Sequence, residues 1–329
     1  MKTVMYTLDE VRGKLAAGQK LILAGAERVM RQLPQGAWIG GSIPYFMAEN
    51  GGVFTEDKIF LTELPSYIKE VSFQKYSAAD LSRVYKDAPV NGFSLIIIPS
   101  SSTTHLSFAL NAHNFEEFAT KPLIGWISGI PLDGLGKVSP KVFYGETGEM
   151  LEDGAVVMHV ELPEGKYAEI NIVNIFQQSG GDTITFPEDG FGATEAFVNG
   201  RRENLADYIV ARNIDTRLPL VADYYGVMIN TSFQAIDKAA RKVSFYAPVF
   251  SDIEYKLAAP VAEYVTAFNS QMPQEDIDKI FFSCNCILNY LYSELEGKQT
   301  GGVVGPVTFG EIAYQLLNQT MAYLTIRDL

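Results

Sequence analysis

One apolar run that stops at a proline restricts the fold more than any other part of the chain. In the segment GFSLIIIPSSSTTHLSF, four consecutive apolar residues, Leu95–Ile98, end at Pro99. A short run of this kind is typical of a strand that is covered on both faces. The polar turn Ser100–Thr104 follows, and the next residues, as far as Asn111, favour a helix. The pattern predicts a strand–turn–helix unit of an α/β protein, where ligands collect at the turn.

The N-terminal segment has helical character. Residues Leu8–Ala26 predict two short helices, with Thr7 as the N-cap of the first. The acidic residues Asp9 and Glu10 suit the positive end of that helix, because the helix dipole favours negative charge there. We therefore expect residues 1–35 to form a helical extension.

The rest of the chain mixes strands with a few helices. In GAWIGGSIPYFMAENGG, Ala37–Ile39 predicts a strand, Gly40–Gly41 a tight turn, and Ile43–Phe46 a returning strand. Glycine there relieves a steric conflict, either in a turn or where a ligand approaches. Two alternating runs around LPEGKY predict a hairpin within residues 154–176, and KIFFSCNCI predicts a strand that leads into a helix. These elements predict a mixed α+β fold of two related halves, residues 36–200 and 201–329, with largely antiparallel sheets flanked by helices.

Composition limits the classes of partner. The 329 residues are 47% hydrophobic and 20% charged, which is the balance of a globular protein, and the net charge is −13. An acidic chain is a poor partner for nucleic acid or an anionic membrane, since both require a basic face. No apolar run approaches the roughly 20 residues that span a bilayer. The first residues, MKTVMYTLDEVRGKL, carry regular charges and lack the apolar core of a secretory leader, so we expect a cytoplasmic protein.

Both cysteines lie in FFSCNCI, with Asn285 between Cys284 and Cys286. They could bind metal, act as a redox pair or a nucleophile, or serve as small apolar residues. A structural zinc site takes four ligands, and the chain has no second cysteine pair and no histidine nearby. On a strand, residues two apart face the same side, so both thiols point into one compartment. We therefore expect a structural or pocket-lining role and no metal.

The last fifty residues resemble the C-terminal part of the FIST sensory domain. Phe282-Ser283-Cys284 matches the strand that leads into a helix in that family, and Gly305 matches a later strand. Phe309-Gly310-Glu311 matches its aromatic-Gly-Glu turn, and Asn318-Gln319-Thr320 matches its Asn-x-Thr strand. Gly40-Gly41-Ser42 is similar to a turn in the family's N-terminal half.

The resemblance implies a stand-alone module that binds a small molecule, such as an amino acid, and acts through a signalling partner. The family's glycine and arginine after the cysteine are replaced here by Asn285 and Cys286, so the identity of the ligand does not transfer. Glu311 would sit at the mouth of a pocket and pair with a ligand amine. Asn318 and Thr320 would point to one face of their strand, toward the ligand or a neighbouring loop.

Two alternatives stay open at this point. A hydrolase or transferase would use Ser102 with His105, or Cys284 with Glu311, although the G-x-S-x-G nucleophile elbow is absent. A polar loop that caps a helix and offers N–H groups to an anion explains the serine run more simply. Haem is the alternative cofactor, because a single histidine can be an axial ligand. The candidates for that role are His105, His113 and His159.

The leading hypothesis is a small-molecule-binding sensory protein without catalytic activity. Its ligand would lie in a cleft between the two halves, where polar groups fix orientation and aromatic residues supply contact area. The predicted ligand-binding residues are Gly40, Gly41, Ser42, Ser101, Ser102, Thr103, His105, Cys284, Asn285, Phe309, Gly310, Glu311, Asn318 and Thr320.

Overall fold

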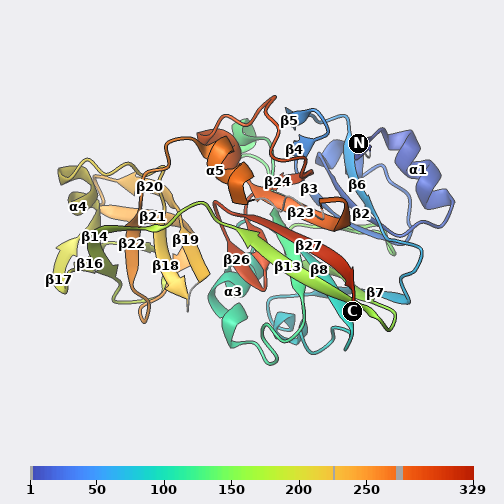
Figure 1. Ribbon diagram of the computed structural model, residues 1–329, viewed down its shortest axis with the longest axis horizontal. Coiled ribbons are helices and arrows are strands. Elements are labelled where there is room, and N and C mark those ends of the chain that lie inside the picture. Colours follow the sequence, from blue (N-terminus) through green and yellow to red (C-terminus); the bar gives the residue numbers. More distant parts are fainter. Residues whose placement is uncertain (1–2, 225–226, 272–276) are drawn as a thin grey trace. The chain divides into compact units, whose positions relative to one another are not determined.

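A computed structural model describes residues 3–224, 227–271 and 277–329. Its fold is mixed α+β with antiparallel and mixed sheets, as the sequence predicts (Figure 1). The chain folds into two compact units. Unit 1 comprises Met1–Ile172, Met272–Leu316 and Met321–Leu329, and unit 2 comprises Val173–Gln271 and Leu317–Thr320.

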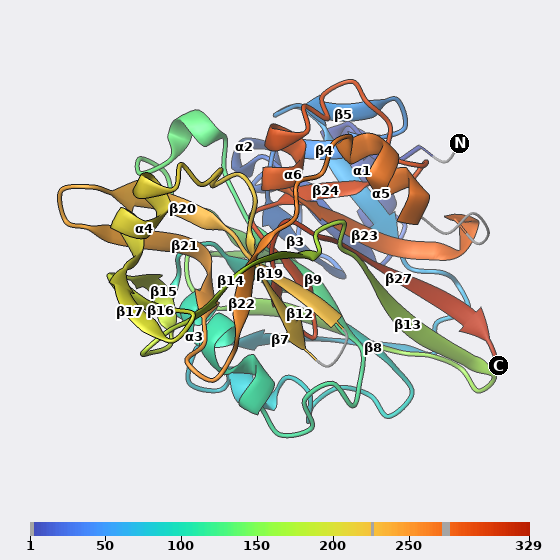
Figure 2. The ribbon, with the colours of Figure 1, turned by 60° about the vertical axis from the view of Figure 1, so that its left-hand side comes forward.

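Unit 1 is built on three six-stranded sheets. The first has the order β1 (Met5–Tyr6), β6 (Ile59–Glu63), β2 (Leu21–Gly25), β3 (Trp38–Ser42), β10 (Val142–Tyr144) and β11 (Glu149–Leu151). The second has the order β26 (Gln315–Leu317), β25 (Glu311–Ala313), β9 (Leu123–Ser128), β8 (Gly92–Pro99), β12 (Ala155–Glu161) and β7 (Glu70–Tyr76). The third has the order β13 (Lys166–Val173), β27 (Met321–Asp328), β23 (Ile280–Cys286), β24 (Gly305–Thr308), β4 (Tyr45–Ala48) and β5 (Gly51–Phe54), and Figure 2 shows β13, β27 and β23 side by side.

The three sheets of unit 1 share one connection pattern. Each contains a parallel strand pair joined through a helix, namely β2–β3 through α2 (Glu27–Met30), β8–β9 through α3 (Thr103–Asn111) and β23–β24 through α6 (Ile287–Tyr292). The chain then carries its next two strands into a neighbouring sheet and returns with β6, β12 or β27, which pairs antiparallel with the first strand. Unit 1 therefore contains a threefold structural repeat in which each member supplies one strand pair to another member's sheet. The pair β4–β5 joins the third sheet, β10–β11 joins the first and β25–β26 joins the second.

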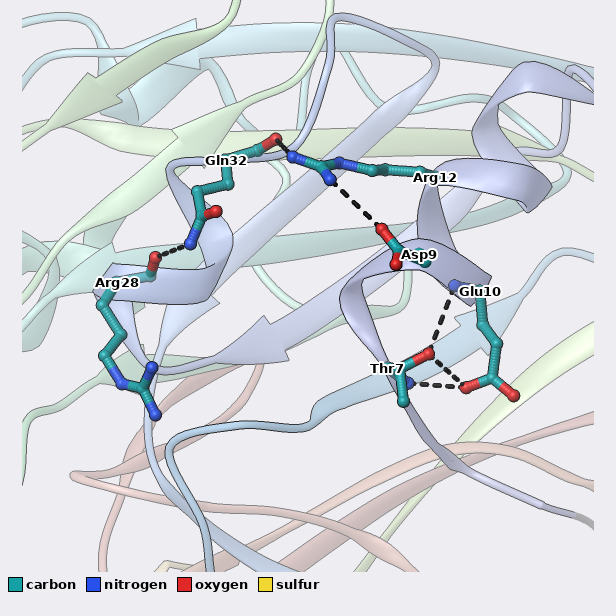
Figure 3. Close-up of polar contacts among 6 residues, drawn as sticks. All are labelled: Thr7, Asp9, Glu10, Arg12, Arg28 and Gln32. Atoms are coloured by element: carbon teal, nitrogen blue, oxygen red, sulfur yellow. Dashed lines mark hydrogen bonds and ion pairs between the residues drawn. The ribbon is translucent and has the colours of Figure 1, made fainter.

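The N-terminal segment belongs to the first of these sheets. Helix α1 (Leu8–Ala16) begins at Thr7, whose hydroxyl accepts a hydrogen bond from the Glu10 N–H while the Glu10 carboxylate accepts one from the Thr7 N–H (Figure 3). The predicted N-cap is thus confirmed. The second predicted helix is wrong, because the apolar residues Leu21–Gly25 form β2 between β6 and β3.

Unit 2 is antiparallel throughout its described strand pairs. One sheet has the order β17 (Arg201–Asn204), β16 (Glu195–Val198), β14 (Gln178–Thr185), β22 (Tyr255–Ala258), β18 (Leu220–Tyr224) and β19 (Val227–Thr231). The other consists of β15 (Gly190–Ala193), β21 (Lys242–Val249) and β20 (Phe233–Asp237). Helix α4 (Leu205–Ala211) packs on a core that includes Phe186, Phe245 and Tyr255, and α5 (Tyr264–Gln271) follows later in the chain.

Candidate functional site

The repeat places the same kind of residue at three equivalent strand ends. Gly25 pairs with Ser42 at the end of β2–β3, Pro99 with Ser128 at the end of β8–β9, and Cys286 with Thr308 at the end of β23–β24. The second strand of each pair therefore ends on a buried hydroxyl residue. Most of the sequence-predicted candidates follow or precede these strand ends, in unit 1.

The residues after the three hydroxyls meet at one point. A Cβ built on Gly129 would lie 2.4 Å from Cδ1 of Phe309 and 2.8 Å from Cδ1 of Ile43, so all three repeats contact one another here. The Gly129 N–H donates to the Ser42 carbonyl oxygen over 2.7 Å, and the Ser42 hydroxyl donates to the Gly129 carbonyl oxygen over 2.8 Å. The structure thus brings the predicted Ser42 and Phe309 together, but as parts of a packed junction.

Gly40 and Gly41 do not form the predicted turn. Both lie inside β3, which runs without a break to Ser42, and the returning strand β4 belongs to another sheet. A Cβ on Gly40 would lie 2.5 Å from Cε of Met30, and one on Gly41 would lie 2.9 Å from Nε1 of Trp126. These glycines allow close approach of protein side chains, which leaves no room for a ligand at either position.

Glu311 is not at the mouth of a pocket. Its side chain is fully buried in β25, opposite Trp126 of β9, and its Oε1 accepts a hydrogen bond from the Thr308 hydroxyl over 3.2 Å. The Thr308 hydroxyl also lies 3.1 Å from the Gly310 carbonyl oxygen. The resemblance-based expectation is therefore wrong, since a carboxyl at this depth serves the core of unit 1.

Cys284 and Cys286 are buried thiols, and Cys284 forms part of β23 beside Asn285. The Cys284 thiol donates to the Gly125 carbonyl oxygen over 3.3 Å. Burial, followed by the nearby Glu311 carboxyl and Cys286 thiol, raises the pKa of the Cys284 thiol well above its usual range. A thiol held in its neutral form is a weak nucleophile, so this geometry does not favour the cysteine-based enzyme alternative.

The serine-rich turn caps α3, and a carboxylate of the chain itself already binds there. The Ser102 hydroxyl accepts from the His105 N–H and donates to the Pro99 carbonyl oxygen, as an N-cap does. Asp153 Oδ1 accepts from the Thr104 N–H over 2.9 Å. Partial burial raises the pKa of Asp153, but hydrogen bonds from backbone N–H groups outweigh it and the net shift is downward. Asp153 was missed by the sequence reasoning, because nothing local links it to α3.

The remaining residues of this turn complete the same cap. Ser101 has a φ of 63°, and its N–H donates to Nδ1 of His105 over 3.1 Å. Thr103 is the first residue of α3, and its side chain helps to lower the pKa of the Asp153 carboxyl. Burial lowers the pKa of His105 to about 4, so the imidazole is neutral near pH 7. The Ser102 hydroxyl donates to the Pro99 carbonyl oxygen and not to the His105 ring, so the predicted serine–histidine pair is not formed.

Asn318 and Thr320 lie in unit 2 and not on a strand. They occupy the turn between β26 and β27, so the expectation that they share one face of a strand is wrong. The Asn318 amide donates to the Asn230 carbonyl oxygen over 3.1 Å and accepts from the Ser232 N–H over 3.0 Å. Asn318 thus connects this turn by hydrogen bonds to β19 and to the residue that follows β19. Thr320 is fully buried.

An open pocket of about 650 Å³ lies in unit 1, and none of the predicted ligand-binding residues is among its described lining residues. Strand β6 contributes one wall, and the first half of β23 with the loop before β24 contributes the other. The polar side chains among its described lining residues are those of Thr62, Ser283 and Asp278. The apolar lining residues are Val4, Phe60, Leu61, Ile277, Ile280, Phe281, Phe282, Val303 and Val304.

The sequence model of a protein family of unknown function, DUF6976, matches residues 6–327. The chain belongs to this family. No curated protein matches the sequence. Among its described residues, this DUF6976 chain has no helix that is both long and apolar enough to cross a membrane.

The DUF6976 chain also contains a buried series of hydrogen-bonded polar side chains that the sequence reasoning missed. Ser94 Oγ lies 2.7 Å from Nδ1 of His159, and His159 Nε2 lies 3.0 Å from the Tyr76 hydroxyl, which donates to Asp87. Burial lowers the pKa of His159 to about 4, with opposing smaller effects from Asp87 and Lys121. Both ring nitrogens are engaged, so His159 does not present a nitrogen to haem iron. His113, the third candidate, is exposed beside Asn114.

Proposed function

We propose that this chain is a small-molecule-binding protein whose ligand occupies the 650 Å³ pocket of unit 1. This volume lies within the range of roughly 300–1,000 Å³ that ligand sites occupy. A lining of aromatic and aliphatic side chains with a few polar groups is also typical of such sites. The pocket is the observation that carries the proposal.

The ligand we propose has an apolar body. Phe281, Phe282 and Leu61 supply contact area, and burial of apolar surface contributes about 25 cal/mol per Å². A free amino acid is a poorer fit, because its ammonium and carboxylate groups need charged partners when they leave water. Among the described lining residues, Asp278 is the one ionisable residue, and it is exposed.

We propose that binding serves sensing and not catalysis. The Ser102 hydroxyl donates to a backbone carbonyl oxygen and the Cys284 thiol is held neutral, so neither supports a nucleophilic role. The resemblance of Phe282–Cys284 to a FIST motif supports a sensory role with a signalling partner, since Phe282 and Ser283 line the pocket. The two cysteines are thiols and not a disulfide, which suits a reducing compartment, so we place the protein in the cytoplasm.

A neutral apolar dye, N-phenyl-1-naphthylamine, tests this proposal. We expect saturable binding of one dye per chain, seen as enhanced fluorescence. Val304→Trp places a large ring in the pocket from a partly exposed loop position and should weaken dye binding at least tenfold. Val138→Trp is the matched control, because Val138 is an exposed loop valine outside the pocket. Equal dye affinity in Val304→Trp and the wild type would contradict the proposal.

A further inference from the structure

A second, much smaller void adjoins the wall of the 650 Å³ pocket that β23 and the loop before β24 form. It measures about 10 Å³, and Ser283 and Val303 line both it and the pocket. A volume of this size admits one oxygen-sized atom. Its other lining residues are Met47, Cys284, Asn285, Thr300, Gly305 and Met321.

Asn285 presents a donor without a partner. Its Oδ1 accepts from the Cys286 N–H over 2.8 Å and from Asn289 Nδ2 over 2.9 Å. Since a backbone N–H can only donate, these contacts fix Oδ1 on that side, and Nδ2 is the remaining amide atom. Within the part of the chain that the structure describes, Nδ2 has no hydrogen-bond partner, although Asn285 is only 3% exposed.

Thr300 presents a second such group. Its Oγ1 is buried and has no hydrogen-bond partner among residues 3–224, 227–271 and 277–329, and the residue is 2% exposed. A buried polar group without a partner costs about 1–3 kcal/mol, so two of them around one void are costly unless something binds there. Cys284 does not meet this need, because its thiol donates to the Gly125 carbonyl oxygen.

We propose that this void is the polar end of the ligand pocket and that it binds one uncharged acceptor oxygen between Asn285 Nδ2 and Thr300 Oγ1. The inference rests on the proposed function and narrows its ligand to an apolar alcohol or ketone. A carboxylate or phosphate is excluded by size, since the void takes a single atom, and by charge, since none of the described residues that line it is a cation. Water supplies the same chemistry when no ligand is bound.

The ligand arm of the test uses a probe pair that differs by one hydroxyl group, 2-naphthol and naphthalene. We expect wild-type protein to bind 2-naphthol about tenfold more tightly by fluorescence titration, the effect of roughly one good hydrogen bond. Thr300→Val keeps the shape, removes the hydroxyl and should abolish the preference while leaving naphthalene affinity unchanged. Asn285→Asp replaces the donor by an acceptor and should also abolish the preference for 2-naphthol. Thr62→Val, in the pocket but not in the void, is the control and should keep the preference.

The outcomes separate the two proposals. Equal affinity of the wild type for both probes, or a preference retained in Thr300→Val, would overturn the oxygen site and leave pocket binding intact. Failure of both probes to bind would overturn the proposed function together with this inference. A high-resolution crystal structure distinguishes the source of the oxygen. Within hydrogen-bond distance of Asn285 Nδ2 and Thr300 Oγ1, we expect density for a water molecule in the crystal without probe and for the naphthol oxygen in the crystal with it. The absence of such density from both crystals would contradict the site.

Discussion

The ring of Phe309 occupies the space that a side chain on Gly129 would need. A Cβ at Gly129 would lie 2.4 Å from the Phe309 ring, well inside van der Waals contact, and Ile43 closes the other side. These residues follow the equivalent hydroxyls of the three repeats, so this contact holds the repeats of unit 1 together. The Phe309-Gly310-Glu311 motif therefore has a structural role that its resemblance to a sensory domain does not suggest.

Gly129→Ala should destabilise the protein by about 1–3 kcal/mol, because a methyl group would overpack this junction. The free energy of unfolding, measured by urea denaturation, gives the value. Gly134→Ala is the control and should change the free energy of unfolding little, since the atom nearest to a Cβ built on Gly134 would be 3.7 Å away. The double variant with Phe309→Leu should recover part of the loss. Full stability of Gly129→Ala would show that the junction is not packed in this way.

Local features of the fold could be predicted from the sequence. The strand–turn–helix unit from Leu95 to Asn111 is confirmed as β8 and α3, because its apolar run and capping serine act over a few residues. The Thr7 cap is confirmed for the same reason. Among the candidate site residues, Ser102 was correctly expected to be in a capping loop.

Long-range features could not be predicted. The hairpin expected around LPEGKY is wrong, because β12 and β13 are consecutive in the chain but lie in different sheets. The Gly40–Gly41 pair predicts a turn, whereas glycine is required at these positions because Met30 of α2 and Trp126 of β9 approach β3 closely. The threefold repeat could not be recognised from the sequence, since its members share strand connections and only one kind of residue, the hydroxyl residue at the end of the second strand. The pocket and its oxygen site likewise combine β6, β23 and the loop before β24.

The N-cap of α1 gives a second prediction. Thr7→Ala should lower the free energy of unfolding by about 1 kcal/mol, because the Glu10 N–H loses its acceptor at the helix start. Thr7→Ser keeps the oxygen and should lie close to the wild type. Urea denaturation followed by circular dichroism measures both variants, and equal stability of Thr7→Ala and Thr7→Ser would contradict the capping role.

The thiols give a third prediction. Cys284 and Cys286 are at most 1% exposed, and the pKa of Cys284 is raised, so Ellman's reagent should react with the native protein at pH 7.5 on the order of 100-fold more slowly than with free cysteine. Two thiols should react at once in guanidinium chloride, which serves as the internal control. Rapid native labelling of Cys284 would instead favour the cysteine-based enzyme alternative.

The fourth prediction concerns pH and His159. Its folded-state pKa, about 4, lies below the ordinary value of 6.5, so the unfolded state binds the proton more readily between these values. Protonation of His159 therefore has little effect on stability above pH 6.5, and it destabilises the folded state increasingly as pH falls toward 4. Between pH 7 and pH 5 the loss should be about 2 kcal/mol.

His159→Gln isolates this effect. The variant should be less stable than the wild type at pH 7, because contacts with Ser94 and Tyr76 change, but its loss of unfolding free energy between pH 7 and pH 5 should be about 2 kcal/mol smaller. His113→Gln is the control, since His113 is exposed, and it should follow the wild-type curve. His105, whose pKa is also about 4, contributes a parallel loss that both variants retain. Identical pH dependence in His159→Gln and the wild type would show that His159 does not stay neutral in the fold.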